Sequence, residues 1–283
     1  MSYNGNVCPS EGNGLHTSSR SHIITSLIKN RRQCANLKSL VVIPTYNERE
    51  NIRPLVDEIL ALASPVDVVI VDDNSPDGTG ELADALVAEY PTRVQVIHRP
   101  AKLGLGTAHI AGFKLALSQD VERVLSMDAD FSHHPRYIPA LLAKSEKAHL
   151  VIGSRYVRGG GTRFCSWKRR MLSLGANLFA KTMLGLPARD CTAGFRCYHR
   201  EVLLSIDLDS ILANGYSFLI EMIYRTKRQG WRVAEVPIIF EDRRQGVSKI
   251  SRWEILAALQ TVVRLTVWRL RRRLDPTCGQ RSA

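Results

Sequence analysis

Short apolar runs alternate with segments of helical periodicity along the first half of the chain. Runs of roughly four to eight apolar residues bounded by polar loops are typical of strands buried on both faces of a parallel sheet. The alternation predicts an α/β fold with a mostly parallel sheet flanked by helices. The expected strands span residues 39–44, 66–71, 94–98 and 122–127.

The second half continues this alternation less regularly. Its pattern predicts further strands at 150–153, 190–198 (after a turn) and 232–239, and helices at 135–147, 170–184, 217–229 and 251–273. Residues 1–37 have no sustained periodicity and predict a disordered extension. We expect one folded domain over 38–250, a C-terminal helix at 251–273 and a tail at 274–283.

Acidic residues follow three of the expected strands. Glu48 follows the first strand, Asp72 and Asp73 the second, and Asp128 and Asp130 the fourth. Ligands of open parallel sheets bind at the carboxyl ends of the strands. Two carboxylates one residue apart on an extended segment point the same way and can share Mg²⁺ or Mn²⁺. Such a cation usually takes further oxygen ligands from substrate phosphates, which indicates that a nucleotide diphosphate binds nearby. The alternative to a metal site is that Asp128 and Asp130 are two solvated acids in a turn.

Charge is distributed unevenly along the chain. The formal net charge is +12. Between residues 155 and 273 there are 23 Lys and Arg residues and 9 Asp and Glu residues. The rest of the chain has 16 Lys and Arg residues and 18 Asp and Glu residues. An anionic partner is therefore expected on the second half, either a membrane surface or an anionic substrate; acid-lined strand ends disfavour nucleic acid.

Several common signatures are missing from the sequence. The third glycine of a G-x-G-x-x-G fingerprint would fall on His109, which argues against a dinucleotide site, and no P-loop motif occurs. The six cysteines show no CxxC spacing, which indicates free thiols. Residues 1–20 lack the apolar run of a secretory signal, so a cytoplasmic location is expected.

The last expected helix is apolar but carries several arginines. Arg264 interrupts its apolar run and Arg269 closes it together with residues 271–273, so it lacks the roughly 18 uninterrupted apolar residues of a spanning helix. It could lie in a membrane interface with its arginines at anionic headgroups, or simply pack on the domain as an amphipathic helix.

Eight short motifs, each weak alone, occur in a specific order. They are PTYNE, DDNSPDGT, KLGLGTA, MDADFSHHP, GSRY, W-x-x-R followed by a serine, D-x-T-x-G-F-R and EDR-x-x-G-x-SK, between about residues 39 and 249. Together they resemble the dolichyl-phosphate (polyprenyl-phosphate) mannosyltransferases of glycosyltransferase family 2. The resemblance implies a Rossmann-like GT-A domain that transfers mannose from GDP-mannose to a dolichyl or polyprenyl phosphate, with inversion and with metal dependence.

The resemblance also assigns the donor site. Asp128 and Asp130 would hold the metal against the diphosphate, and Arg243 and Lys249 would close over it. Carboxylates accept hydrogen bonds from guanine and ribose, and a tyrosine ring can lie against the base. The other donor-binding residues implied are Pro44, Tyr46, Glu48, Val71, Asp73 and Ala129. His133 and His134 match the motif but are expected to be scaffold.

The acceptor site is assigned in the same way. The lipid phosphate would be bound by Arg155, Arg169 and Ser173. The expected catalytic residues are Asp130, Arg155 and Arg169. A phosphomonoester has a second pKa of about 6 and is mostly dianionic at neutral pH, so it needs no strong base. Asp190 could contact sugar, act as a base or be structural.

The polyprenyl acceptor implies a protein peripheral to the cytosolic face of a membrane, with small membrane subunits as possible partners. Three alternatives stay open. A polyprenyl-phosphate glucosyltransferase would use UDP-glucose on nearly the same scaffold. A nucleotidyltransferase would release pyrophosphate. A basic module that binds membranes or nucleic acid would have no activity.

Overall fold

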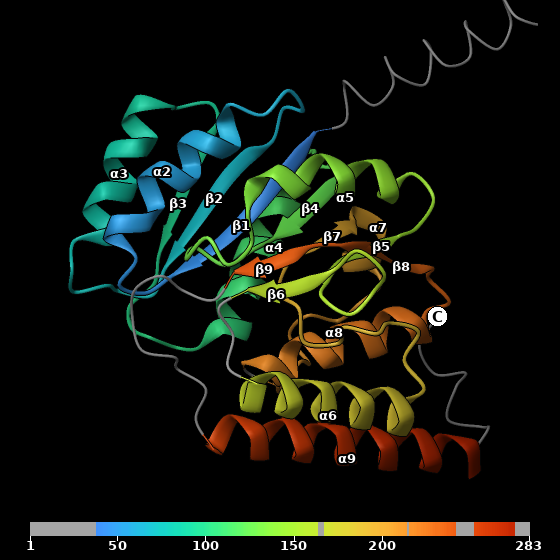
Figure 1. Ribbon diagram of the computed structural model, residues 1–283. Coiled ribbons are helices and arrows are strands. Elements are labelled where there is room, and N and C mark those ends of the chain that lie inside the picture. Colours follow the sequence, from blue (N-terminus) through green and yellow to red (C-terminus); the bar gives the residue numbers. More distant parts are fainter. Residues whose placement is uncertain (1–37, 164–166, 214, 242–251, 275–283) are drawn as a thin grey trace, which may run out of the picture. The chain divides into compact units, whose positions relative to one another are not determined.

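The computed structural model describes residues 38–163, 167–213, 215–241 and 252–274 (Figure 1). The extension predicted at 1–37 lies outside the described residues, as does the tail except for Leu274. From residue 38 onward the described residues belong to one unit.

A seven-stranded sheet forms the centre of the described part, in the order β3-β2-β1-β4-β7-β5-β8 (Figure 1). Every neighbouring pair is parallel except that β7 runs antiparallel to β4 and β5. This confirms the prediction of a mostly parallel sheet flanked by helices. The strands are β1 (Ser39–Thr45), β2 (Asp67–Asp72), β3 (Val94–His98), β4 (Arg123–Ser126), β5 (Leu150–Ser154), β7 (Arg196–His199) and β8 (Val233–Pro237), and a second, parallel pair is β6 (Gly161–Arg163) with β9 (Ile239–Glu241).

Helices cover both faces of the large sheet because alternate residues of its strands enter different cores. Val41 and Ile43 of β1 pack on the side of α2 (Arg49–Leu60), α3 (Thr79–Glu89) and α5 (Ile138–Ser145). Leu40 and Val42 pack on the opposite side. That side carries α4 (Leu105–Ser118), α6 (Trp167–Leu184), α7 (Arg200–Leu204), α8 (Tyr216–Arg228) and α9 (Arg252–Leu274).

Helix α4 lies unusually close to the sheet at Gly112. A Cβ atom added there would lie 2.3 Å from Cγ1 of Val42, so only glycine fits at this position. Since α4 begins just after the loop that follows β3, this contact also places the 99–104 loop beside the ends of β1 and β2.

Some predicted boundaries differ from the observed ones. The strand predicted over 190–198 covers only β7, because residues 190–195 form an irregular segment. The strand predicted over 232–239 divides into β8 and β9, since Ile238 ends the pairing with β5 and the chain turns to pair with β6. The helix expected at 135–147 begins as a single 3₁₀ turn, η1 (Pro135–Tyr137), and α7 was not expected.

Helix α9 packs against α6 and α8 through its buried side. Val262 and Leu265 enter the core. The buried carboxylate of Glu221 on α8 holds Arg264 of α9 at 2.7 Å and Arg225 at 2.6 Å. Among the described helices, none is both long enough and apolar enough to cross a membrane.

Candidate active site

Three loops follow the carboxyl ends of β1, β2 and β4, and each contains a non-glycine residue with positive φ. These residues are Asn47 (φ 58°), Asn74 (φ 56°) and Phe131 (φ 59°). Asparagine tolerates this left-handed conformation, but a bulky aromatic residue is strained in it. Such strain tends to persist where the surrounding structure holds a functional geometry in place.

Side-chain hydrogen bonds join the loops after β1 and β2. The Asp72 carboxylate accepts from Thr45 Oγ1 at 3.0 Å, from Ser75 Oγ at 2.6 Å and from the Ser75 amide at 3.0 Å. The Glu48 amide donates to Thr79 Oγ1, and the Glu48 carboxylate accepts from Asn51 Nδ2 at 2.9 Å. Glu48 is thus held beside the second loop with its side chain in a defined position.

Asp73 has a basic partner that the sequence analysis did not identify. Arg99, which follows β3, lies 2.5 Å from its carboxylate, and both side chains are buried. Burial raises the pKa of Asp73 above its ordinary value, and the charge of Arg99 and the amides of Leu103 and Gly104 offset only part of the rise. Asp73 therefore also orders the 99–104 loop at this edge of the sheet.

Tyr46 also has a partner from that loop. The Lys102 ammonium lies 4.0 Å from the centroid of the Tyr46 ring. A cation over an aromatic face is favourable, and it brings a positive charge to the predicted donor site. Pro44 and Tyr46 are half-buried, and Val71 is fully buried at the end of β2.

The loop after β4 places Asp128 and Asp130 at the rim of the sheet. Asp130 Oδ1 accepts from the Ser132 amide at 3.1 Å and from Ser132 Oγ at 2.5 Å. The Asp128 carboxylate lies beside Gly194, where an added Cβ would be 3.3 Å from Oδ1. Ala129 is buried between the two acids.

The two histidines of this loop, which are expected to be scaffold, contact neighbouring parts of the chain. Nδ1 of His133 accepts from the Asp128 amide at 3.2 Å, and its ring packs against Phe195 and Phe240. Nδ1 of His134 accepts from the Arg136 amide, which caps η1.

The acids fit a divalent cation that is shared with a ligand. Among the residues that the structure describes, no group of three or more His, Cys, Asp or Glu side chains could hold a metal ion. Asp128 and Asp130 supply only hard carboxylate oxygens, the donor type preferred by Mg²⁺ and Mn²⁺. Further ligands would have to be water or phosphate oxygens, which suits a diphosphate.

Arg155 lies just beyond β5 and is fixed by a fully buried carboxylate. Its Nε and one terminal nitrogen each donate to Asp190 at 2.7 Å, its amide donates to the same carboxylate at 3.0 Å, and Thr192 Oγ1 accepts a further bond at 2.8 Å. Burial works to raise the pKa of Asp190, but the bonds and charge of Arg155 outweigh it and hold that pKa below its ordinary value. This arrangement suits a structural anion better than a proton acceptor.

Two further groups support the Asp190 segment. Glu235 on β8 accepts from the amides of Arg189 and Asp190. The buried Arg196 donates to the carbonyls of Cys191, Ala193 and Leu219, so it joins this segment to α8. The D-x-T-x-G-F-R motif contains Arg196, but the sequence alone could not show that its charge faces inward.

The remaining predicted acceptor residues lie on or near α6. Ser173 Oγ accepts from the hydroxyl of Tyr156, the residue after Arg155, at 2.8 Å. Position 169 lies one turn before Ser173 on the same helix, and the Arg169 side chain is outside the described part. Arg243 and Lys249 also lie outside the described residues, so the structure does not test their predicted roles.

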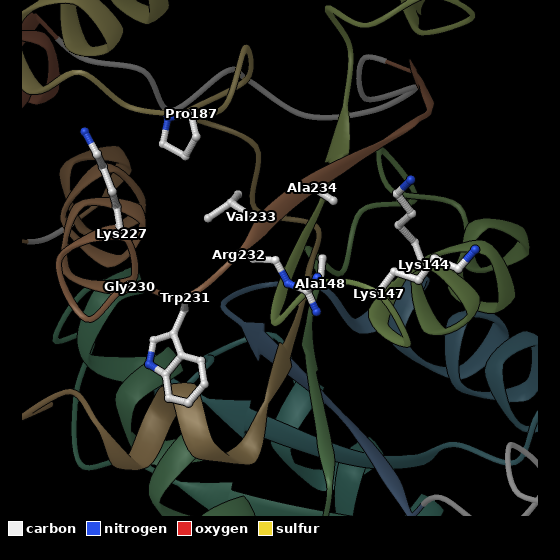
Figure 2. Close-up of a pocket in the computed structure, with 10 residues that line it drawn as sticks. All are labelled: Lys144, Lys147, Ala148, Pro187, Lys227, Gly230, Trp231, Arg232, Val233 and Ala234. Carbon is white, nitrogen blue, oxygen red and sulfur yellow. The ribbon is translucent and has the colours of Figure 1, made fainter.

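A pocket of about 500 Å³ lies elsewhere, at the amino ends of β5 and β8 (Figure 2). Since β5 runs parallel to β8 and in the same direction as β4, these ends are at the opposite edge of the sheet from Asp128 and Asp130. Its lining includes Lys144, Lys147, Lys227 and Arg232 but none of the predicted site residues.

Comparisons with known proteins bear on the family and the fold of the chain. The model for glycosyl transferase family 2 matches residues 40–206. The chain is 45% identical over 243 residues to the polyprenol monophosphomannose synthase of Mycolicibacterium smegmatis, which covers 86% of this chain and 91% of that protein. It is 44% identical over 241 residues to the undecaprenyl-phosphate mannosyltransferase of Micrococcus luteus, covering 84% and 97% respectively.

Solved structures support the fold. Glucosyl-3-phosphoglycerate synthase from Mycobacterium tuberculosis in complex with Mn²⁺, uridine diphosphate and glucosyl-3-phosphoglycerate superposes with a TM-score of 0.59 at 21% identity, over 81% of this chain and 80% of that one. The same enzyme with Mg²⁺ and uridine diphosphate gives a TM-score of 0.58 at 23% identity, over 81% and 80%. At this level of identity the likeness shows the fold.

Proposed function

Because the chain belongs to glycosyl transferase family 2 and is therefore an enzyme of that family, we propose that it transfers mannose from GDP-mannose to a dolichyl or other polyprenyl phosphate. The products are polyprenyl-phosphate mannose, with inversion at the anomeric carbon, and GDP.

The observation that carries this proposal is the likeness to two relatives. Both are named for mannose transfer to a polyprenol or undecaprenyl phosphate, and this chain covers at least 91% of each at 44% identity or more. Family membership also argues against the nucleotidyltransferase and binding-module alternatives, since the matched residues 40–206 contain all the motifs except EDR-x-x-G-x-SK.

The donor would bind across the loops after β1, β2 and β3. Glu48 is oriented by Asn51 and can accept from a base or ribose donor group. Tyr46 offers a ring face for the base, and Lys102 brings a positive charge to the same place. Arg243 and Lys249 remain proposed contacts to the diphosphate, as do Val71, Ala129 and Pro44 to the nucleoside.

Asp128 and Asp130 would hold Mg²⁺ or Mn²⁺ together with the diphosphate. Bound there, the cation would neutralise the negative charge that develops on the departing GDP. Ser132 contributes by fixing Asp130 with two hydrogen bonds, so the carboxylate is oriented before any ligand arrives.

Arg155, Arg169 and Ser173 would bind the acceptor phosphate. Arg155 is already positioned by Asp190 and Thr192, so little side-chain freedom would be lost on binding. A dianionic phosphate oxygen can attack the anomeric carbon without a general base. The buried position of Asp190 agrees with a reaction in which that residue takes no proton.

The acceptor lipid would reach the site from a membrane surface at the cytosolic side. Helices α6 and α9 pack against each other at one edge of the domain (Figure 1). Both helices expose apolar side chains. Such a surface, with arginines nearby, suits the headgroup region of a membrane. The exposed apolar residues are Trp167, Met171, Leu178 and Met183 on α6, and Leu259, Val263, Val267 and Trp268 on α9.

Vesicle sedimentation tests the membrane contact. Val263→Asp should reduce binding to vesicles that contain anionic phospholipid, whereas Leu212→Asp, which changes an equally apolar and more exposed residue outside both helices, should not. Equal binding by the two variants would contradict the proposed surface and would favour recruitment by separate membrane subunits.

The test of the reaction itself compares acceptor use with donor binding. Arg155→Ala should lower mannose transfer to a short polyprenyl phosphate by about 100-fold while GDP-mannose binding, measured by calorimetry, changes by less than about threefold. The double variant Arg155→Met with Asp190→Asn avoids leaving an unpaired buried carboxylate. It should likewise lose mannose transfer and keep GDP-mannose binding.

A matched control is Arg163→Ala on β6, which removes an exposed arginine that pairs with Glu241 and not with Asp190. It should transfer mannose at a normal rate. Loss of donor binding and transfer together in both Arg155 variants would contradict the acceptor role of Arg155.

A further inference from the structure

Asn177 on α6 connects that helix to the segment that holds Arg155. Its side chain is 3% exposed. Its Oδ1 accepts from the Cys191 amide at 2.6 Å, and its Nδ2 donates to Thr192 Oγ1 at 3.2 Å and to the Ser173 carbonyl at 2.8 Å. One amide therefore contacts the two residues that follow Asp190, the buried partner of Arg155, and also the helical turn that carries Ser173.

The contacts continue without a break to the guanidinium. Thr192 Oγ1, which accepts from Asn177, also accepts from Arg155 at 2.8 Å. Asp190, one residue before Cys191, accepts the two other guanidinium bonds. A shift of the 190–192 segment relative to α6 would therefore move Arg155 relative to Ser173.

Only an amide of this length can make the observed set of bonds. The Cys191 amide must donate, so it requires an oxygen; the Ser173 carbonyl must accept, so it requires an N–H. An aspartate would place a second oxygen against the Ser173 carbonyl, and alanine would leave the Cys191 amide without its partner. Both bonds are buried, where an unpaired polar group is costly.

We infer that Asn177 is a positioning residue for the acceptor phosphate. It holds α6, which carries Ser173 and position 169, against the 190–192 segment that orients Arg155. The arginine and the helix can therefore bind one phosphate together. The inference rests on the proposed function, because it takes Arg155 and Ser173 as the groups that grip the acceptor. It assigns no contact between Asn177 and any substrate.

Steady-state kinetics of the full chain test this role. Asn177→Ala should raise the KM for polyprenyl phosphate about tenfold and leave the KM for GDP-mannose within about twofold. A purely structural defect would instead lower kcat through a smaller active fraction, with both KM values unchanged. Thr182→Ala on the same helix is the control, because it removes a bond only to α6 itself and should behave like the unmodified chain.

A pH profile of Asn177→Asp gives a second readout. The introduced carboxylate is buried against a carbonyl, so burial would favour its neutral form, which can donate as the amide does. The KM for polyprenyl phosphate should therefore approach that of the unmodified chain as the pH is lowered from about 8 to about 6. The ratio of the KM of Asn177→Asp to the KM of the unmodified chain should therefore change with pH. A ratio that stays constant would contradict the role.

A spectroscopic measurement separates this inference from the proposed function. Exchange of the Arg155 Nε proton with solvent, followed by ¹⁵N NMR and assigned with Arg155→Lys, should be at least about tenfold faster in Asn177→Ala than in Thr182→Ala. Unchanged exchange together with unchanged KM values would overturn the inference. Failure of the unmodified chain to use any polyprenyl phosphate would overturn the proposed function and leave the exchange result to decide the positioning of Arg155.

Discussion

His109 should make the stability of the folded chain depend on pH. It lies in α4, fully buried, and neither ring nitrogen has a hydrogen-bond partner among the described residues. Its ring stacks against Phe113 and Phe218, with centroids at 5.8 Å and 5.7 Å, and those two rings also contact each other. Burial, assisted by the charge of Arg196, lowers the pKa of His109 from 6.5 to about 3.

The sign and size of the effect follow from this shift. Below pH 6.5 the unfolded chain binds a proton at this histidine, whereas the folded chain stays neutral until about pH 3. Stability is therefore full above pH 6.5 and is lost as the pH falls. Between pH 7 and pH 5 the loss from this one group is about 2 kcal/mol.

Urea unfolding at the two pH values measures the loss. Replacing the residue, as in His109→Leu, should reduce the difference in unfolding free energy between pH 7 and pH 5 by about 2 kcal/mol relative to the unmodified chain. Other titrating groups contribute to both proteins and cancel. Phe113→Leu loosens the same aromatic cluster but keeps the histidine, so it should retain the full pH difference. If His109→Leu also retains it, within about 0.5 kcal/mol, the assignment of a neutral buried imidazole is refuted.

Three further predictions concern packing and the site loops. Gly112→Ala should destabilise the fold by about 1–3 kcal/mol in chemical denaturation, because its Cβ would overlap a valine of β1. Arg99→Met should cost about 3 kcal/mol in the same assay by leaving Asp73 buried without its partner, whereas the double variant with Asp73→Asn should recover most of that loss. Ser132→Ala removes one of two bonds that orient Asp130 and should raise the Mn²⁺ concentration for half-maximal transfer by about threefold, with an unchanged free energy of unfolding. If a metal titration gives the same half-maximal Mn²⁺ concentration for the variant and the unmodified chain, this role of Ser132 is refuted.

The sequence predicted the parallel sheet because the information for it is local. Each strand of the first half is an apolar run, interrupted only by Gln95 in β3, and each run stops at a polar loop. The rule that ligands bind at the carboxyl ends of such strands then predicted that Glu48, Asp73 and Asp128 belong to one edge, and β1, β2 and β4 do end side by side there.

The partners of these residues could not be predicted, because tertiary contacts set them. Asp73 and Arg99 are 26 residues apart, and they meet only because β2 pairs with β3. The antiparallel direction of β7 likewise depends on the irregular segment before it, which carries Asp190. No periodicity in the sequence marks Asn177 as different from any other polar residue of α6.

Motif membership was a signal for two of the residues whose contacts were not predicted. Lys102 and Arg196 both stand inside motifs that identify the family, yet their contacts became visible only in the structure. The role of Asp190 shows the same limit, since its residue type suits a base and only its complete burial against Arg155 favours a structural role.

The most direct test of the central claim is transfer of labelled sugar into a lipid phase. The chain would be incubated with Mg²⁺ or Mn²⁺, a short polyprenyl phosphate and membrane lipid, with labelled GDP-mannose in one tube and labelled UDP-glucose in another. We predict label in the organic phase from GDP-mannose, and none when Asp130→Ala replaces the unmodified chain. Label from UDP-glucose instead would contradict mannose as the donor sugar, and none from either donor would contradict the proposed function.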